Sequence, residues 1–124
     1  MTSSTSQDQL YRFLEDRFSC ALACTECARA CAVRASLIDP GGAECQERAR
    51  RLGLMCAEAC DATRRVLSEE DAQIESGVRV RVAWCRSVCL ECAAAFDEDP
   101  DAESVAALCR ACAEACGDFL QLLT

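Results

Sequence analysis

Apolar residues recur along most of this chain at steps of three and four, which is the spacing of one face of an α-helix. Residues typical of turns and helix caps interrupt the pattern at three places: "DPGG" at 39–42, "LSEED" at 67–71 and "DEDPD" at 97–101. The pattern therefore predicts four helices, over about residues 6–38, 42–67, 69–96 and 100–122.

Capping residues support these boundaries. Ser6 and Ser68 each stand three residues before a side chain that can complete a capping box. For Ser68 this side chain is Asp71. Asp99 stands directly before Pro100, as an N-cap does before a proline at the first helical position. We expect the first, third and fourth helices to begin near these three caps.

The apolar face of each predicted helix consists largely of cysteine. All thirteen cysteines fall on positions that a bundle helix turns toward its neighbours. They are Cys20, Cys24, Cys27, Cys31, Cys45, Cys56, Cys60, Cys85, Cys89, Cys92, Cys109, Cys112 and Cys116. Because short connections make successive helices antiparallel, the sequence predicts one all-α domain over residues 1–124. Its architecture is an antiparallel up-down-up-down four-helix bundle with a cysteine-lined core.

The cysteine content also bears on the redox state. In a short secreted chain it would indicate a disulfide scaffold, but the number of cysteines is odd and the start of the chain has no secretory or twin-arginine signal pattern. The residues between the cysteines are rich in Ala, Leu, Glu and Arg, which favour long helices. No stretch approaches the roughly 18 apolar residues of a membrane span. We expect a soluble cytoplasmic protein with reduced thiols.

The charge pattern excludes several functions. The net charge is −8, and the chain has neither lysine nor histidine. An acidic surface without a basic stripe is unsuited to binding nucleic acid. The absence of histidine removes the commonest ligand of catalytic zinc and the usual general base, so we expect a protein that is not an enzyme.

The spacing of the thiols favours Cu(I). Two cysteines four residues apart on a helix have Cβ atoms about 5–6 Å apart, and two metal–sulfur bonds in line span about 4.6 Å. A two-coordinate soft ion therefore fits such a pair without bending the helix. Five pairs have this spacing: Cys20–Cys24, Cys27–Cys31, Cys56–Cys60, Cys85–Cys89 and Cys112–Cys116. If each thiolate bridges two ions, copper and thiolate balance one to one and the buried core is neutral, which predicts about one Cu(I) per cysteine.

Other roles for the same cysteines stay open at this point. A zinc or other soft-metal buffer would use tetrahedral sites, each carrying a charge of about −2 when held by four thiolates. "CALACTEC" and "CRSVCLEC" have the spacing of iron–sulfur motifs, although a helical seam of cysteine gives the same steps of three and four. A thiol redox protein would need a reactive pair at a helix start. The thiols could also be ordinary apolar packing.

The inward cysteines and the recurring Cys-x-x-x-Cys pairs resemble the bacterial copper storage proteins (Csp) over residues 6–122. The resemblance implies a homotetramer of bundles, each filled with Cu(I), that serves copper storage and detoxification without catalysis. In lacking an export-signal pattern, the chain is similar to the cytosolic branch of the family. The chain departs from many members in having no histidine, so no histidine lines a pore mouth here.

The order of the cysteines along the bundle predicts an entrance for copper. Cys45 and Cys92 lie nearest the turns at 39–42 and 97–101, and Cys20 lies farthest from them. Beyond Cys20 the seam is apolar and forms a plug of Leu10, Phe13, Leu14, Leu67, Ile74, Val78, Leu120 and Leu123. We expect the first end to be open. Its acidic residues Asp97, Glu98 and Asp99 either attract cations or serve as an ordinary solvated helix cap.

Two further residues beside the seam have alternative roles. Met55 is either a thioether ligand or, more commonly, a core filler. Trp84, near Val80 and Val88, either lies between chains or caps the local core. On the surface, Glu44–Arg48 and Glu47–Arg51 have the spacing of helical ion pairs.

Overall fold

The computed structural model describes residues 2–39, 41–68 and 75–123, and it contains four long helices. They are α1 (Thr2–Leu37), α2 (Glu44–Ser68), α3 (Glu75–Phe96) and α4 (Glu103–Leu122), with a 3₁₀ turn, η1 (Pro100–Ala102), between the last two. The described part contains no strand. The predicted all-α fold is confirmed.

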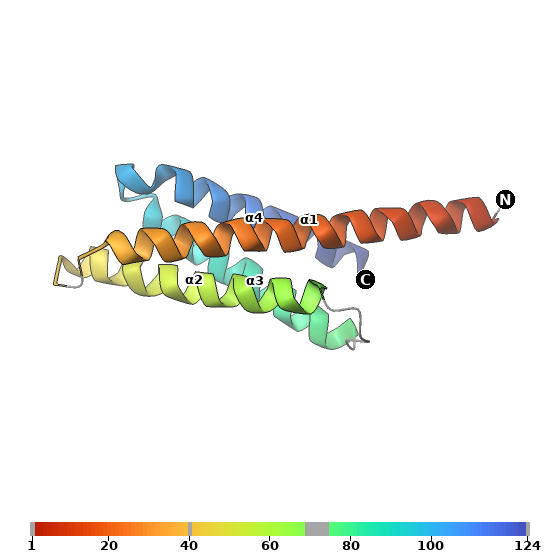
Figure 1. Cartoon of the computed structure of the whole chain (residues 1–124), viewed down its shortest axis with the longest axis horizontal. Coiled ribbons are helices and arrows are strands. Elements are labelled where there is room, and N and C mark those ends of the chain that lie inside the picture. Colours follow the sequence, from red (N-terminus) through yellow and green to blue (C-terminus); the bar gives the residue numbers. More distant parts are fainter. Residues whose placement is uncertain (1, 40, 69–74, 124) are drawn as a thin grey trace.

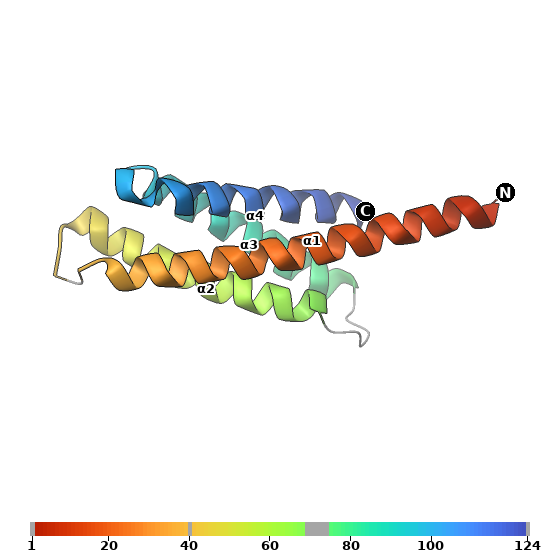
Figure 2. The ribbon, with the colours of Figure 1, turned by 45° about the horizontal axis from the view of Figure 1, so that its top comes forward.

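The helices pack as an antiparallel bundle in which each lies beside its neighbours in sequence. Helix α1 contacts α2 and α4, and α3 contacts the same two helices. Because α4 also packs against α1, the four helices surround a single axis (Figures 1 and 2). This is the predicted up-down-up-down arrangement. None of the described helices combines the length and the apolar character that a bilayer span requires.

The capping predictions had mixed outcomes. Asp99 has extended backbone angles (φ −114°, ψ 109°) and its carboxylate accepts a hydrogen bond from the Asp101 amide at 2.9 Å, with Pro100 next, as predicted. The start at Ser6 is wrong, because α1 is already helical from Thr2 and no glycine or proline interrupts it there. Ser68 is the last residue of α2 rather than a cap of the next helix, and Asp71 lies outside the described residues.

The first turns of α1 project beyond the rest of the bundle (Figures 1 and 2). Leu10, which the sequence assigned to the apolar plug, lies on this projection and is 56% exposed. The assignment is wrong because the apolar periodicity continues past the height at which the neighbouring helix α4 ends. Ile74, assigned to the same plug, lies outside the described residues.

Apolar layers close the core at both of its ends. At the end marked by the C-terminus, called here the Phe119 end, the rings of Phe13 and Phe119 lie 5.5 Å apart, beside the buried Leu67 and Val82. At the opposite end, called the Pro100 end, α3 terminates in Phe96, which is fully buried. The cysteines occupy the space between these two layers.

Candidate metal centre

Twelve of the thirteen cysteines are fully buried and pack together in one part of the core, called here the chamber. All twelve have no exposed surface, and all four helices contribute to them. They are Cys20, Cys24, Cys27, Cys31, Cys56, Cys60, Cys85, Cys89, Cys92, Cys109, Cys112 and Cys116. The exception is Cys45, which is exposed, so the prediction that every cysteine faces the core is wrong at this position. Cys45 is the second residue of α2, where the helix has just begun.

The closest sulfur–sulfur contacts join different helices. The Sγ atoms of Cys31 (α1) and Cys109 (α4) are 3.5 Å apart, and those of Cys60 (α2) and Cys89 (α3) are 3.6 Å apart. Within a helix, Cys27–Cys31 and Cys56–Cys60 are longer, at 3.9 and 4.0 Å. Sequence spacing identified the pairs on one helix, but it gave no sign of these cross-helix partners, which depend on how the helices pack.

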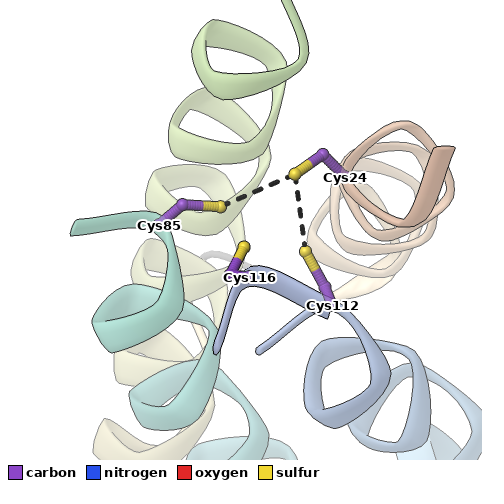
Figure 3. A group of neighbouring side chains, drawn as sticks. All are labelled: Cys24, Cys85, Cys112 and Cys116. Carbon is purple, nitrogen blue, oxygen red and sulfur yellow. Dashed lines mark hydrogen bonds between the residues drawn. The ribbon is translucent and has the colours of Figure 1, made fainter. Parts of the chain in front are cut away.

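Ten of the sulfurs form four groups of four, within each of which all Sγ atoms lie within 4.8 Å of one another. The groups are Cys27–Cys31–Cys56–Cys109, Cys27–Cys56–Cys60–Cys89, Cys60–Cys85–Cys89–Cys112 and Cys24–Cys85–Cys112–Cys116. Figure 3 shows the last of these, with sulfurs from α1, α3 and α4 pointing toward one another. Each group shares two sulfurs with the next, so the four form a ladder rather than separate sites.

The two remaining buried thiols extend the ladder at its ends. Cys92 contacts Cys31 at 3.9 Å, and Cys20 contacts Cys116 at 3.7 Å. A continuous thiol row therefore runs from Cys92, at the Pro100 end, to Cys20, at the Phe119 end. Counting residues from the turns predicts Cys85 near the Pro100 end and Cys56 and Cys60 near the Phe119 end, and this is wrong. Cys85 lies in the group nearest Cys20, Cys56 lies in the group nearest Cys92, and Cys60 lies in the two middle groups. Counting residues from the turns ignored the axial offset between neighbouring helices.

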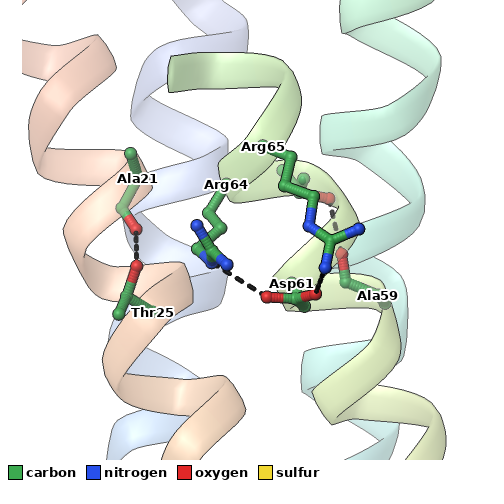
Figure 4. Close-up of polar contacts among 7 residues, drawn as sticks. Ala21, Thr25, Ala59, Asp61, Arg64 and Arg65 are labelled. Atoms are coloured by element: carbon green, nitrogen blue, oxygen red, sulfur yellow. Dashed lines mark hydrogen bonds and ion pairs between the residues drawn. The ribbon is translucent and has the colours of Figure 1, made fainter. Parts of the chain in front are cut away.

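Within the part of the chain that the structure describes, no charged side chain is buried with the thiols. Among the described residues, the one buried polar side chain is Thr63, whose hydroxyl donates to the Ala59 carbonyl at 2.7 Å. Thr25 makes the same local bond to Ala21, and the charges of Asp61, Arg64 and Arg65 pair outside the core (Figure 4). Both hydroxyl protons are therefore donated to carbonyls of the threonines' own helices.

The buried thiols interact with one another, so the pKa of some is raised and that of others is lowered, as for Cys20 by its hydrogen bond with Cys116. A hydrogen bond with Cys109 and burial both raise the pKa of Cys31, and a hydrogen bond with Cys112 and burial do the same for Cys60. Neighbouring thiols in a dry chamber cannot all carry a negative charge without a compensating cation. A metal ion that enters must therefore displace protons, which couples binding to pH.

Cys45 opens into a small pocket at the Pro100 end. The pocket has a volume of about 290 Å³, and its lining includes Arg34, Ile38, Ala49, Glu98 and Asp99 but none of the buried cysteines. The prediction that this end is open is therefore wrong for the described structure. Cys92, predicted as a landing site beside Cys45, has no exposed surface.

The acidic residues at the Pro100 end are largely neutralised. Asp97 pairs with Arg110 and Asp99 pairs with Arg34. Glu98 remains as a carboxylate in the lining of the Cys45 pocket. The arrangement favours the interpretation of these residues as a helix cap and ion-pair network over a strong attraction for cations.

The other candidates lie outside the chamber. Met55 is 45% exposed, so it is neither a ligand to the row nor a core filler, because it lies one residue from Cys56 and turns outward. Trp84 is 42% exposed on α3, whereas Val88 is buried. Glu47 pairs with Arg50, at 2.7 Å, instead of the predicted Arg51.

Comparison with known proteins gives one consistent family. The model of the copper storage protein family (Csp) matches residues 6–121. A histidine-to-alanine variant of Streptomyces lividans Ccsp has 30% sequence identity and a TM-score of 0.64, and the match covers 95% of this chain and 97% of that one. The same protein loaded with 10 copper equivalents has 30% identity and a TM-score of 0.62, with 92% and 85% covered.

A third similar structure is described as a cytosolic copper storage protein from Streptomyces lividans with five coppers. It has 30% identity and a TM-score of 0.51, and the match covers 97% of this chain and 92% of that one. No protein with curated annotation matches the chain.

Proposed function

This chain belongs to the copper storage protein family, and from that premise we propose that it holds about one Cu(I) per cysteine without catalysing a reaction. Twelve thiols would bind copper inside the chamber, and Cys45 would add one at its edge. The observation that carries the proposal is the ladder of four groups that share sulfurs. Shared sulfurs suit ions that are bridged by thiolates, as a dense store requires.

The sulfur spacing fits low-coordinate copper. For metal–sulfur bonds of about 2.3 Å, sulfurs lie about 4.0 Å apart around a three-coordinate ion and about 4.6 Å apart around a linear one. The contacts in the row range from 3.5 Å for Cys31–Cys109 to 4.0 Å for Cys56–Cys60. Three-coordinate Cu(I) therefore requires these sulfurs to separate by at most about 0.5 Å, and two-coordinate Cu(I) requires them to separate by about 0.6–1.1 Å.

Charge supports the same ion. A chamber without charged side chains favours a filling that is neutral overall. One Cu(I) for each thiolate satisfies this condition throughout filling, provided that each copper ion replaces one proton. Thiol protons leave as copper enters, so the chamber never needs to hold a large net charge.

A zinc or other divalent soft-metal buffer is the second candidate, because each of the four groups also has the ligand number of a tetrahedral site. Four such groups accept at most four metal ions per chain. The two candidates therefore differ in capacity by about threefold.

Anaerobic titration of the reduced protein separates them. We expect Cu(I) uptake to continue to about 12 or 13 ions per chain, with one proton released per ion. Saturation near four ions, or stronger retention of zinc than of copper in a competition, would instead support the divalent buffer.

We also propose that the chain forms a homo-oligomer, a tetramer by its resemblance to the family, in the cytosol. One relative is described as cytosolic. The outer face of α1 carries exposed Leu22, Val33 and Leu37 along a groove of about 680 Å³ against α4. An apolar face of this kind suits another copy of the chain. Leu22→Glu is expected to lower the molar mass measured by light scattering, and an unchanged mass would place the contact elsewhere.

A further inference from the structure

The proposed store has no open path to its buried thiols in the described structure. The twelve buried cysteines have no exposed surface, and the pocket that contains Cys45 touches none of them. A copper ion that reaches this pocket must therefore pass through the layer between Cys45 and the outermost thiols of the row, Cys31 and Cys92.

Phe96 is the central residue of that layer. It follows Cys92 by one turn on the same face of α3, and it is fully buried. The tip of its ring reaches across to α2: a Cβ atom added to Gly53 would lie 3.2 Å from Cζ of Phe96 and 3.5 Å from the carbonyl oxygen of Cys31. Gly53 thus permits the ring to lie directly against the backbone of α2, at a point where α2 also lies close to the backbone of Cys31.

The ring is the one large side chain fully buried at this end among the described residues. The others buried to 2% exposure or less there are small, namely Ala35, Ala93, Ala102 and Ala106. Ile38, Leu52 and Val105 keep 8–9% exposure and so lie at the rim. Movement of one ring would therefore open the layer, because alanines cannot close the space that the ring leaves.

An ion pair holds the chain next to the ring. Asp99 donates its backbone amide to the Phe96 carbonyl at 3.1 Å, and its carboxylate binds Arg34. Arg34 lies one turn beyond Cys31 on α1, and both partners line the Cys45 pocket. The pair thus ties α1 to the segment that directly follows Phe96.

We propose that Phe96 is a gate between the Cys45 pocket and the thiol row, and that the Arg34–Asp99 ion pair holds it closed. The inference rests on the proposed storage of copper. Cu(I) bound at Cys45 passes to Cys92 and Cys31 when the ring turns aside, by exchange of one thiolate ligand for another, and a proton leaves each thiol that becomes a ligand. No oxidation or reduction is involved.

The test compares two truncations of buried phenylalanine, one at each end of the chamber. Phe96→Ala should speed the initial uptake of substoichiometric Cu(I), and its removal by a small chelator, on the order of tenfold, equivalent to a gating cost of about 1.4 kcal/mol. Phe119→Ala is the matched control, since it removes the same ring from the Phe119 end and should leave both rates within about twofold. Stopped-flow absorbance in the thiolate–copper band measures them.

Several results would overturn the gate. Unchanged rates of copper uptake and removal in Phe96→Ala, at normal copper capacity, would contradict it. Equal acceleration in Phe119→Ala would also contradict it, because it would indicate general loosening of the bundle or passage at the Phe119 end. If Phe96→Ala does not fold, Phe96→Leu takes its place, and the absence of any acceleration in that variant is equally decisive. Asp99→Asn, which keeps a capping side chain but removes the charge, should accelerate uptake severalfold. Unchanged uptake there would reject the ion pair as a latch.

Different measurements test the gate proposal and the storage proposal, so either can be refuted without the other. The capacity of the unmodified protein tests storage alone, because it is an equilibrium quantity. A protein that takes up about four metal ions refutes one Cu(I) per cysteine whatever the rates. A protein that takes up about 12, at a rate insensitive to Phe96, keeps its function and loses the gate.

Discussion

The two ends of the chamber exclude water by different means. At the Phe119 end all four helices contribute a large apolar side chain: Phe13, Leu67, Val82 and Phe119. At the Pro100 end a single ring, Phe96, lies among alanines and adjoins a pocket with an exposed thiol.

Opening the first end would disturb several interlocked side chains, whereas opening the second needs one ring and one ion pair to move. Two ends of a core with equal burial can therefore differ in how readily they open. Burial reports whether water reaches a residue in the folded state, and the number and size of its neighbours determine what it costs to expose it. The following predictions test whether the ends differ in this way.

The largest effect is expected from alkaline pH on the metal-free protein. Thiols with raised pKa, such as Cys31 and Cys60, keep their protons in the folded state, whereas the unfolded chain loses them above about pH 8.5. At these thiols the folded state then binds more protons than the unfolded one, so the stability that they contribute is complete below that pH and falls as pH rises, by up to about 1.4 kcal/mol per pH unit for each such thiol.

Urea denaturation at pH 7 to 10 measures this slope. Phe96→Ala sharpens the comparison, because water admitted at the Pro100 end would let the outer thiols ionise in place and make the slope shallower. The same slope in both proteins would mean that the ring does not seal the chamber.

Phe119→Ala should cost the metal-free protein about 3–5 kcal/mol of unfolding free energy, since it leaves a cavity among large neighbours and removes the contact with Phe13. Phe96→Ala should cost less, because the adjoining pocket lets solvent fill the space. Chemical denaturation of both variants gives the order. The reverse order would make the Pro100 end the more permanent of the two.

Paired thiol replacements should separate capacity from access. Cys45→Ser with Cys92→Ser, and Cys20→Ser with Cys116→Ser, should each lower copper capacity by about two ions. Only the first pair lies at the Pro100 end, so only it should slow early uptake. Cys116 is the partner of Cys20 in this variant because their sulfurs are in contact at 3.7 Å, whereas Cys60 lies in the middle of the row, within reach of Cys85 and Cys89. Equal slowing by both pairs would place the passage elsewhere.

The smallest effect is expected from Arg110→Gln. Its ion pair with Asp97 is about half exposed, and exposed pairs contribute no more than about 1 kcal/mol. Thermal unfolding should shift slightly, and copper uptake should not change, in contrast to the removal of the Arg34–Asp99 pair. A clear change in uptake would mean that ion pairs act at the Pro100 end through overall charge rather than through contact with the gate.

Helical periodicity along the chain was sufficient to predict the bundle and most of the chamber. Steps of three and four place Cys20 through Cys31 on one face of α1, and the same rule on the other helices identified the twelve buried thiols. The pattern works because side-chain direction along a helix depends only on residue number. It also carried the family resemblance, which the comparisons bear out.

Tertiary structure determines which residues are enclosed and which are in contact, because both depend on a residue's height along the bundle axis and on its neighbours from other helices. Cys45 and Leu10 have core periodicity, yet both are exposed, because at their heights the surrounding helices do not enclose them. Phe96 has the same seam position as a cysteine, but its close packing against Gly53 of α2, at the end of the row, is not predicted by the periodicity. Helical periodicity fixes the angle around an axis, whereas the offsets between helices, set by their connections and packing, fix which residues meet.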